Sequence, residues 1–138
     1  YPRLKDYAEE MANEARIEGW VKSISGRKRI IQDIHSDNQA LKKAAERKAV
    51  NTPIQGSAAD IIKIAMVQID DCFKSKHLDA KILLQVHDEL VIEVADKDLD
   101  EAKKLVEKYM THFYRWEIPQ RLEKIMSISI SDSKCWEK

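Results

Sequence analysis

The residues best suited to chemistry are His87, Asp88 and Glu89, which stand together between two apolar runs at residues 81–86 and 90–94. A link this short predicts a tight β-hairpin with the three polar residues at its tip. Two aliphatic strands would fix a carboxylate at that tip in space, as metal binding in a catalytic site requires. The alternative is a solvated turn, since Asp and His also tolerate left-handed backbone.

A second set of polar residues, Arg47, Asn51 and Gln55, recurs at four-residue spacing. This spacing places Arg47 and Asn51 on one face of a helix. Pro53 is expected to interrupt the backbone, so Gln55 is predicted to lie in the first turn of the next helix. Arg, Asn and Gln side chains hydrogen-bond base edges and phosphates, which favours a nucleic-acid contact. The alternative is an exposed helix face, with Gln55 acting only as a capping residue.

Positive charge is concentrated in residues 22–48, although the whole chain has 24 basic and 24 acidic residues and no net charge. This stretch holds eight basic and three acidic residues, and its basic residues include Arg27, Lys28 and Arg29. A local positive stripe suits a phosphate backbone. A solvated loop and helix face would show the same charge pattern.

The apolar spacing predicts the elements that would position these residues. Helical spacing predicts four helices, at residues 4–15, 36–50, 52–73 and 99–113. Alternating or β-branched apolar runs predict five strands, at residues 20–24, 29–31, 81–86, 90–94 and 125–130. Gly19 can end the first helix, and Thr52 with Gln55 forms a capping box for the third. The predicted class is α+β, with helices packed on one side of a small antiparallel sheet.

Composition excludes several classes of protein. No run of 18 or more apolar residues is present, so no membrane span is expected. Three Gly and three Pro argue against collagen-like chains and Gly-rich phosphate loops. Two cysteines, Cys72 and Cys135, are too few to staple 138 residues and favour a reduced, intracellular setting. The chain begins at Tyr1 without a methionine or a signal peptide, which suggests a piece of a longer protein.

Two segments of the chain closely resemble the C-terminal part of the family A DNA polymerases, the bacterial polymerase I type. Residues 46–63 read ERKAVNTPIQGSAADIIK, and residues 84–90 read LQVHDEL. The basic segment around Arg27 also resembles that family, and the likeness extends over most of the chain. The resemblance implies part of a polymerase domain, with about residues 1–50 forming fingers-side helices and the basic hairpin, and about residues 51–138 forming the palm.

In that family the His-Asp-Glu turn carries one of two metal-binding aspartates. The resemblance therefore implies that Asp88 ligates the catalytic Mg²⁺ ions, of which the complete polymerase holds two. Glu89 would support the site from beside Asp88, and His87 would lie near the primer 3′ end.

The resemblance also implies that Arg47, Asn51 and Gln55 contact the primer–template duplex, mainly through the minor groove. Hydrogen bonds there check the geometry of a base pair with little reading of its sequence. The basic residues Arg27, Lys28 and Arg29 would bind the same DNA.

The implied activity is template-directed addition of deoxynucleotides to a primer 3′ end by two-metal nucleotidyl transfer. The partners would be primer–template DNA and deoxynucleoside triphosphates, and the protein would be a monomer of the bacterial cytoplasm, associated with the nucleoid in replication or repair. The family's other metal aspartate and its nucleotide-binding helix lie upstream of these residues, so the isolated chain is expected to be inactive. The alternative function is a non-catalytic accessory module that binds primer–template DNA. A helical interaction domain is disfavoured by the length of the two matching segments.

Overall fold

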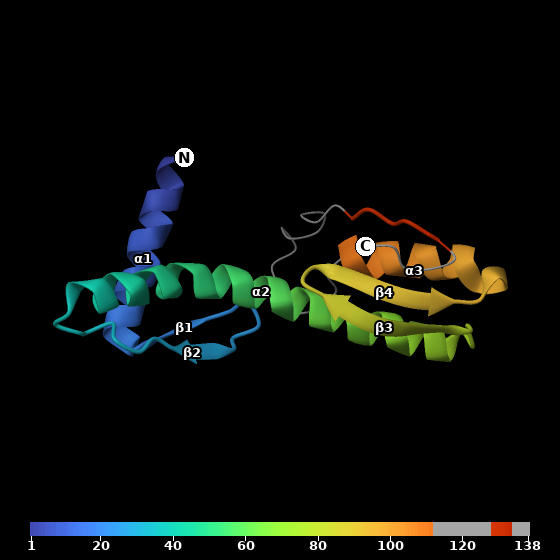
Figure 1. Cartoon of the computed structure of the whole chain (residues 1–138), viewed down its shortest axis with the longest axis horizontal. Helices are drawn as coiled ribbons and strands as arrows, with labels where there is room; N and C mark the ends of the chain where they lie inside the picture. The colour runs from blue at the N-terminus through green and yellow to red at the C-terminus, as the bar shows by residue number, and fades with distance from the viewer. Residues whose placement is uncertain (112–127, 134–138) are drawn as a thin grey trace. The chain divides into compact units, whose positions relative to one another are not determined.

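The structure is a computed structural model that describes residues 1–111 and 128–133, and the chain divides into two compact units, Tyr1–Asp60 and Ile61–Lys138. In chain order the elements are α1 (Pro2–Glu18), β1 (Trp20–Lys22), β2 (Lys28–Ile30), α2 (Gln39–Ser75), β3 (Ala80–Val86), β4 (Glu89–Val94), a 3₁₀ turn (Asp96–Asp98) and α3 (Leu99–Thr111) (Figure 1). Three helices and two two-stranded antiparallel sheets among the described residues confirm the predicted α+β class.

Local signals account for the start of the first unit. Gly19 adopts a left-handed conformation with φ of 75°, and its N–H donates to the Ala15 carbonyl at 2.9 Å, which ends α1 as predicted. Strands β1 and β2 form the predicted basic hairpin, with Trp20 opposite Ile30. Gly26 supplies the positive φ of its turn, 80°. The core of the unit consists of buried aliphatic residues on α1, the hairpin and α2: Ala15, Val21, Ile31, Ile34, Ala45 and Ala49.

The predicted break between the second and third helices is wrong, because α2 runs without interruption through Pro53. Asn38 begins this helix, since its side-chain oxygen accepts the Ala40 N–H at 2.9 Å. Thr52 is buried in mid-helix, so Thr52 and Gln55 form no capping box.

Pro53 removes one N–H donor, which leaves the Ala49 carbonyl without its usual helical partner. Contacts with the rest of the first unit hold the helix together on both sides of this defect. Ala49 is fully buried in the core, and the Tyr7 hydroxyl donates to the Val50 carbonyl at 3.3 Å. One turn further along, Ser57 is hydrogen-bonded to Ile24 of the hairpin. Tertiary packing therefore overrides the local preference of proline.

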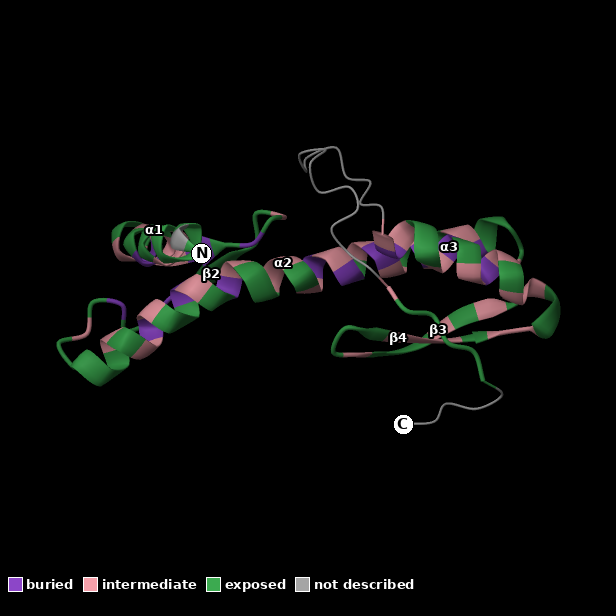
Figure 2. Ribbon diagram, turned by 90° about the horizontal axis from the view of Figure 1, so that it is seen from above, coloured by how far each residue is buried: buried purple, intermediate pink, exposed green. Residues whose placement is uncertain are grey.

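The second unit packs two helical segments on one side of the β3–β4 hairpin, as predicted. Figure 2 shows α3 and the later part of α2 on the same side of this hairpin, with buried positions along both helices. The buried core lies on the two helices and comprises Ala65, Ile69, Phe73, Ala102, Leu105 and Met110. Ile82, Leu90 and Ile92 of the hairpin pack against it. Cys72 is half-buried against the same cluster, and its thiol donates to the Tyr109 hydroxyl at 3.1 Å.

The last predicted strand, residues 125–130, is only partly within the described residues. Residues 128–130 are described and belong to no strand, so the prediction is wrong for them. Ile128 packs against the core of the second unit, which accounts for an apolar position in this segment without strand pairing. Residues 125–127, Cys135 and the predicted end of the fourth helix at residue 113 lie outside the described residues. Within the described part of the chain, the helices are too short or too polar to cross a membrane.

Candidate functional site

The tip of the β3–β4 hairpin is a two-residue turn. Val86 pairs with Glu89, so His87 and Asp88 are the two central residues. His87 has a φ of 55°, in the left-handed region, and the φ of Asp88 is not positive. The Gln85 side-chain amide donates to the His87 carbonyl at 2.9 Å and braces the turn. The tip is therefore a braced turn, and the polar side chains that it carries make it a candidate site.

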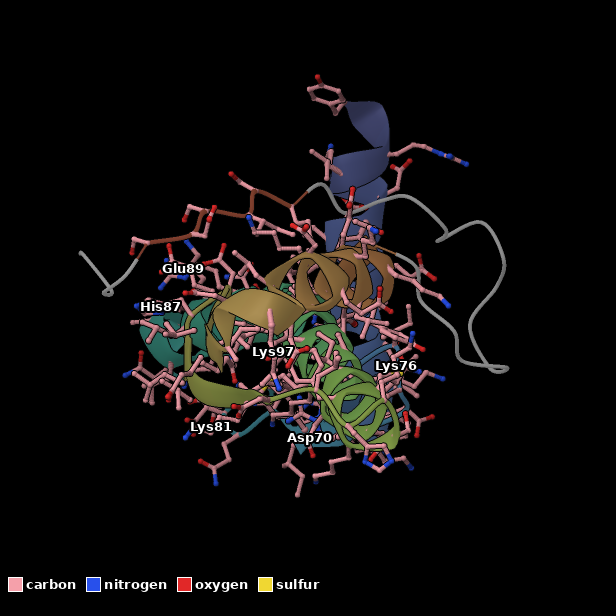
Figure 3. The ribbon with its side chains drawn as sticks, turned by 90° about the vertical axis from the view of Figure 1, so that its right-hand side faces the viewer. Asp70, Lys76, Lys81, His87, Glu89 and Lys97 are labelled. Atoms are coloured by element: carbon pink, nitrogen blue, oxygen red, sulfur yellow. The ribbon has the colours of Figure 1, made fainter. Side chains whose placement is uncertain are left out.

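All three polar residues of the tip are exposed, which leaves their polar atoms accessible. Figure 3 shows His87 and Glu89 near each other at the left of the view. Among the described residues, no hydrogen bond or ion pair engages the Asp88 carboxylate, so its oxygens can accept an external ligand.

These side chains fit a magnesium ion in part. Carboxylate oxygens are the protein ligands that Mg²⁺ prefers, and one or two of them are usually combined with waters and substrate phosphates. Within residues 1–111 and 128–133, no three His, Cys, Asp or Glu side chains come close enough to hold a metal ion. Asp88 can therefore supply one or two ligands of a Mg²⁺ site whose other ligands come from elsewhere.

The second candidate set lies along α2 in the first unit. Because the helix is continuous, four-residue steps rotate by only about 40° each, and Arg47, Asn51 and Gln55 share one face. All three are exposed. Arg47 and Asn51 line a groove of about 830 Å³ between α1 and α2, with Asn13 and Arg16 on the α1 side.

Gln55 lies in a different, smaller groove of about 210 Å³, beside the basic hairpin. Arg27, Lys28 and Arg29 line the same groove, so the structure brings Gln55 together with the three basic residues singled out in the sequence. Among the described residues, no hydrogen bond engages the Gln55 amide.

The three cations of this groove are not equivalent. The Arg27 guanidinium forms an ion pair with Asp60 at 2.9 Å, which neutralises its charge locally. The Lys28 ammonium lies 3.8 Å from the centre of the Trp20 ring, a cation–π contact that orients it. Arg29 is exposed. Lys28 and Arg29 therefore provide most of the uncompensated positive charge of the groove.

Asp60 is a site residue that the sequence reasoning missed. Burial raises its pKa, but hydrogen bonds from Ser23, Ser25 and Arg27, together with the Arg27 charge, bring the pKa below its ordinary value of 3.8. A carboxylate between Ala59 and Ile61 in an apolar helical repeat is a sequence signal for such a buried, partnered group. Gln85 was likewise not assigned a role, although it lies only two residues before His87.

Comparison with known proteins agrees with the motifs. The profile described as DNA polymerase family A matches residues 1–137. DNA polymerase I of Lactococcus lactis is 43% identical over 124 residues, which are 90% of this chain and 14% of that protein. DNA polymerase I of Streptococcus pneumoniae is 45% identical over 119 residues, which are 86% of this chain and again 14% of that protein.

A solved structure is similar as well. It is described as the POL domain of Pol1 from M. smegmatis in complex with DNA primer-template and dNTP, and it matches with a TM-score of 0.77 and 42% sequence identity. The match covers 84% of this chain and 20% of that one. The chain belongs to DNA polymerase family A. It spans about 14% of the length of the curated relatives that it matches.

Proposed function

We propose that this chain is the C-terminal part of a DNA-directed DNA polymerase, in which it carries one of the metal-binding aspartates and part of the primer–template contact. The single observation that carries the proposal is the braced, exposed His-Asp-Glu turn in a chain of this family. About residues 1–50 would belong to the fingers side and about residues 51–138 to the palm. The whole protein would be a monomer of the bacterial cytoplasm that acts at the nucleoid.

In this proposal Asp88 holds the catalytic Mg²⁺ ions, together with an aspartate from outside these residues. When bound, the ions lower the pKa of the primer 3′-hydroxyl and stabilise the leaving pyrophosphate. The chain's own contribution is placement: the paired strands and the Gln85 hydrogen bond brace the backbone of the turn from which the Asp88 side chain projects. Glu89 is the first residue of β4 and pairs with Val86, and it supports the site from beside Asp88. His87 is exposed at the same turn, where it can approach the primer end.

The same proposal assigns the DNA contact to the first unit. Arg47, Asn51 and Gln55 would follow the minor groove, because their exposed side chains are stacked along one continuous helix face. Arg27, Lys28 and Arg29 would lie near the phosphate backbone, with Arg27 already paired to Asp60.

The test is primer extension by two proteins, the longer polymerase that contains these residues and the 138-residue chain alone. We expect the longer protein to add deoxynucleotides in the presence of Mg²⁺ and to stop when the metal is chelated. The chain alone should add none, because one aspartate cannot complete a two-metal site. Extension by the 138-residue chain alone would contradict its assignment as a fragment. Primer–template binding by a longer protein that never extends would favour the accessory module.

A further inference from the structure

The turn of the β1–β2 hairpin rests on one side of α2 through hydrogen bonds to consecutive turns of the helix. The Ser57 hydroxyl accepts the Ile24 backbone N–H at 2.8 Å and donates to the Pro53 carbonyl at 2.5 Å. Ser57 thereby ties the hairpin turn to the helix beside its proline.

One turn further along α2, the Asp60 carboxylate receives the rest of the hairpin turn. The Ser25 hydroxyl donates to Asp60 Oδ2 at 2.5 Å, and the Arg27 Nε–H donates to Asp60 Oδ1 at 3.1 Å. The Asp60 side chain is only 9% exposed, so this pair is shielded from solvent on the acidic side. The buried Asp60 carboxylate receives its hydrogen bonds from the β1–β2 hairpin, so it attaches the hairpin to α2 at one defined point. Exposed ion pairs elsewhere on the surface are weaker and less specific.

Gly56 lets the two elements approach each other. A Cβ built at this position would lie 3.3 Å from the Ser23 Cβ and 3.7 Å from Arg27 Nη2. Glycine weakens a helix relative to alanine, so its presence in the middle of α2 needs a compensating reason. Close contact with the hairpin supplies that reason.

The attachment decides the shape of the groove that holds Gln55. Gln55 precedes Gly56 on the helix, and Lys28 and Arg29 follow Arg27 on the hairpin, so the docking point fixes the distance between the amide and the cations. We propose that Asp60 is a positioning residue: it clamps the basic hairpin onto α2 through Ser25 and Arg27 and thereby shapes the groove for the DNA backbone. Arg27 serves this clamp, and Lys28 and Arg29 meet the phosphates. This inference rests on the proposed function, because it takes DNA as the occupant of the groove.

Simple electrostatics and the clamp make opposite predictions for one substitution. Asp60→Asn removes a negative charge and releases the Arg27 guanidinium, so charge alone predicts tighter DNA binding. The plot of log binding constant against log salt concentration would then be steeper by about one unit for one added phosphate contact. The clamp predicts weaker binding, because the hairpin loses its fixed position. We expect Asp60→Asn to lower the efficiency of single-nucleotide extension by about tenfold to a hundredfold, because a small misplacement of substrate-positioning groups has an effect of this size even when the mutated residue is far from the chemistry.

The experiment uses the longer polymerase with Asp60→Asn, Arg27→Gln and the double variant, and measures primer–template affinity at several salt concentrations, extension efficiency and thermal stability. Residues that act as one clamp should give non-additive losses, with the double variant close to either single one. Ser25→Ala removes one hydrogen-bond donor and no charge, so it should cause a smaller loss of DNA affinity and extension efficiency. This variant still tests the clamp if Asp60→Asn does not fold. Asp70→Asn is the matched control, because Asp70 forms an exposed ion pair with Lys74 on the same helix, and it should behave like the unmutated protein.

Unchanged or tighter DNA binding by Asp60→Asn, with a steeper salt slope, would overturn the clamp. Additive losses in the double variant would also overturn it, since Arg27 would then contact DNA independently of Asp60. If the unmutated protein bound no primer–template DNA, both the clamp and the proposed function would fail. If it bound and extended DNA normally while every clamp variant did the same, only the clamp would fail.

Discussion

Replacing Pro53 with alanine tests whether α2 is one helix in solution. In a continuous helix the new residue regains an N–H for the Ala49 carbonyl and loses the ring that crowds that carbonyl. Proline in a helix interior is about 3 kcal/mol less favourable than alanine, which is an upper limit for the gain. Alanine also gives up the restriction that proline places on the unfolded chain, an advantage of about 0.4–1 kcal/mol. We therefore expect Pro53→Ala to raise the free energy of unfolding by about 1–2 kcal/mol.

Two separate helices would give the opposite sign. Proline would then occupy the first position of the second helix, where its fixed φ is favourable and its missing N–H costs nothing. Alanine would lose the entropic advantage of proline in the unfolded chain and destabilise the protein by about 0.4–1 kcal/mol.

The assay is urea unfolding followed by far-ultraviolet circular dichroism, with hydrogen exchange of the backbone amide at position 53 of Pro53→Ala as a second readout. That amide should be protected if it donates within a helix. Pro53→Gly is the control: it also restores the N–H, but it should be about 1 kcal/mol less stable than the alanine variant. A destabilised Pro53→Ala variant with a rapidly exchanging amide would refute the single helix.

Two further predictions concern the first unit. Gln55→Ala should leave the melting temperature unchanged, because Gln55 is exposed in mid-helix and caps nothing. The same substitution should lower the efficiency of primer extension, most strongly from mismatched primer ends. A lower melting temperature with normal extension would contradict this prediction. For Asp60 the folded pKa lies below 3.8, so the stability that the ionised carboxylate contributes is complete above that pH and is lost as the pH falls through the lower folded value. We therefore expect the unmutated protein to exceed Asp60→Asn in unfolding free energy most strongly near neutral pH, and this difference should shrink below about pH 3.8. A difference that stays constant across this pH range would count against the Asp60 interactions.

Most elements could be predicted from the sequence because their signals are local. Gly19 ends α1 through its own left-handed backbone, and Asn38 begins α2 through its own side chain. The predicted hairpin tip at residues 87–89 is present because the flanking aliphatic residues pair over the strands on either side, but Glu89 already pairs with Val86 in β4, so the turn itself is only residues 87–88.

The errors arose where distant contacts decide the outcome. Thr52, Pro53 and Gln55 form a good local start signal for a helix, but packing of the hairpin and of α1 on both sides keeps α2 continuous. The alternation at residues 125–130 predicted strand pairing, whereas Ile128 packs on a helical core. Neither contact is visible in the sequence around the residue concerned.

The candidate site could be predicted only where its signals are local. The spacing of Arg47 and Asn51 indicated their shared helix face, and the polar tip of the β3–β4 hairpin was evident from the apolar runs beside it. The position of Gln55 beside the basic hairpin was not, because the hairpin contacts α2 through residues distant in the chain, such as Arg27 and Asp60, which are 33 residues apart.

The central claim, that Asp88 is a metal ligand of a polymerase, is tested most directly by Asp88→Ala in the longer protein, with extension rate and primer–template affinity measured on the same preparation. The β3–β4 hairpin should survive, since Ile82, Leu90 and Ile92 still pack on the core of the second unit. We predict that the extension rate falls well over tenfold, a loss of more than about 1.4 kcal/mol of transition-state stabilisation, while affinity for DNA changes little. A variant that keeps more than about a tenth of the unmutated rate would contradict the assignment of Asp88 as a metal ligand.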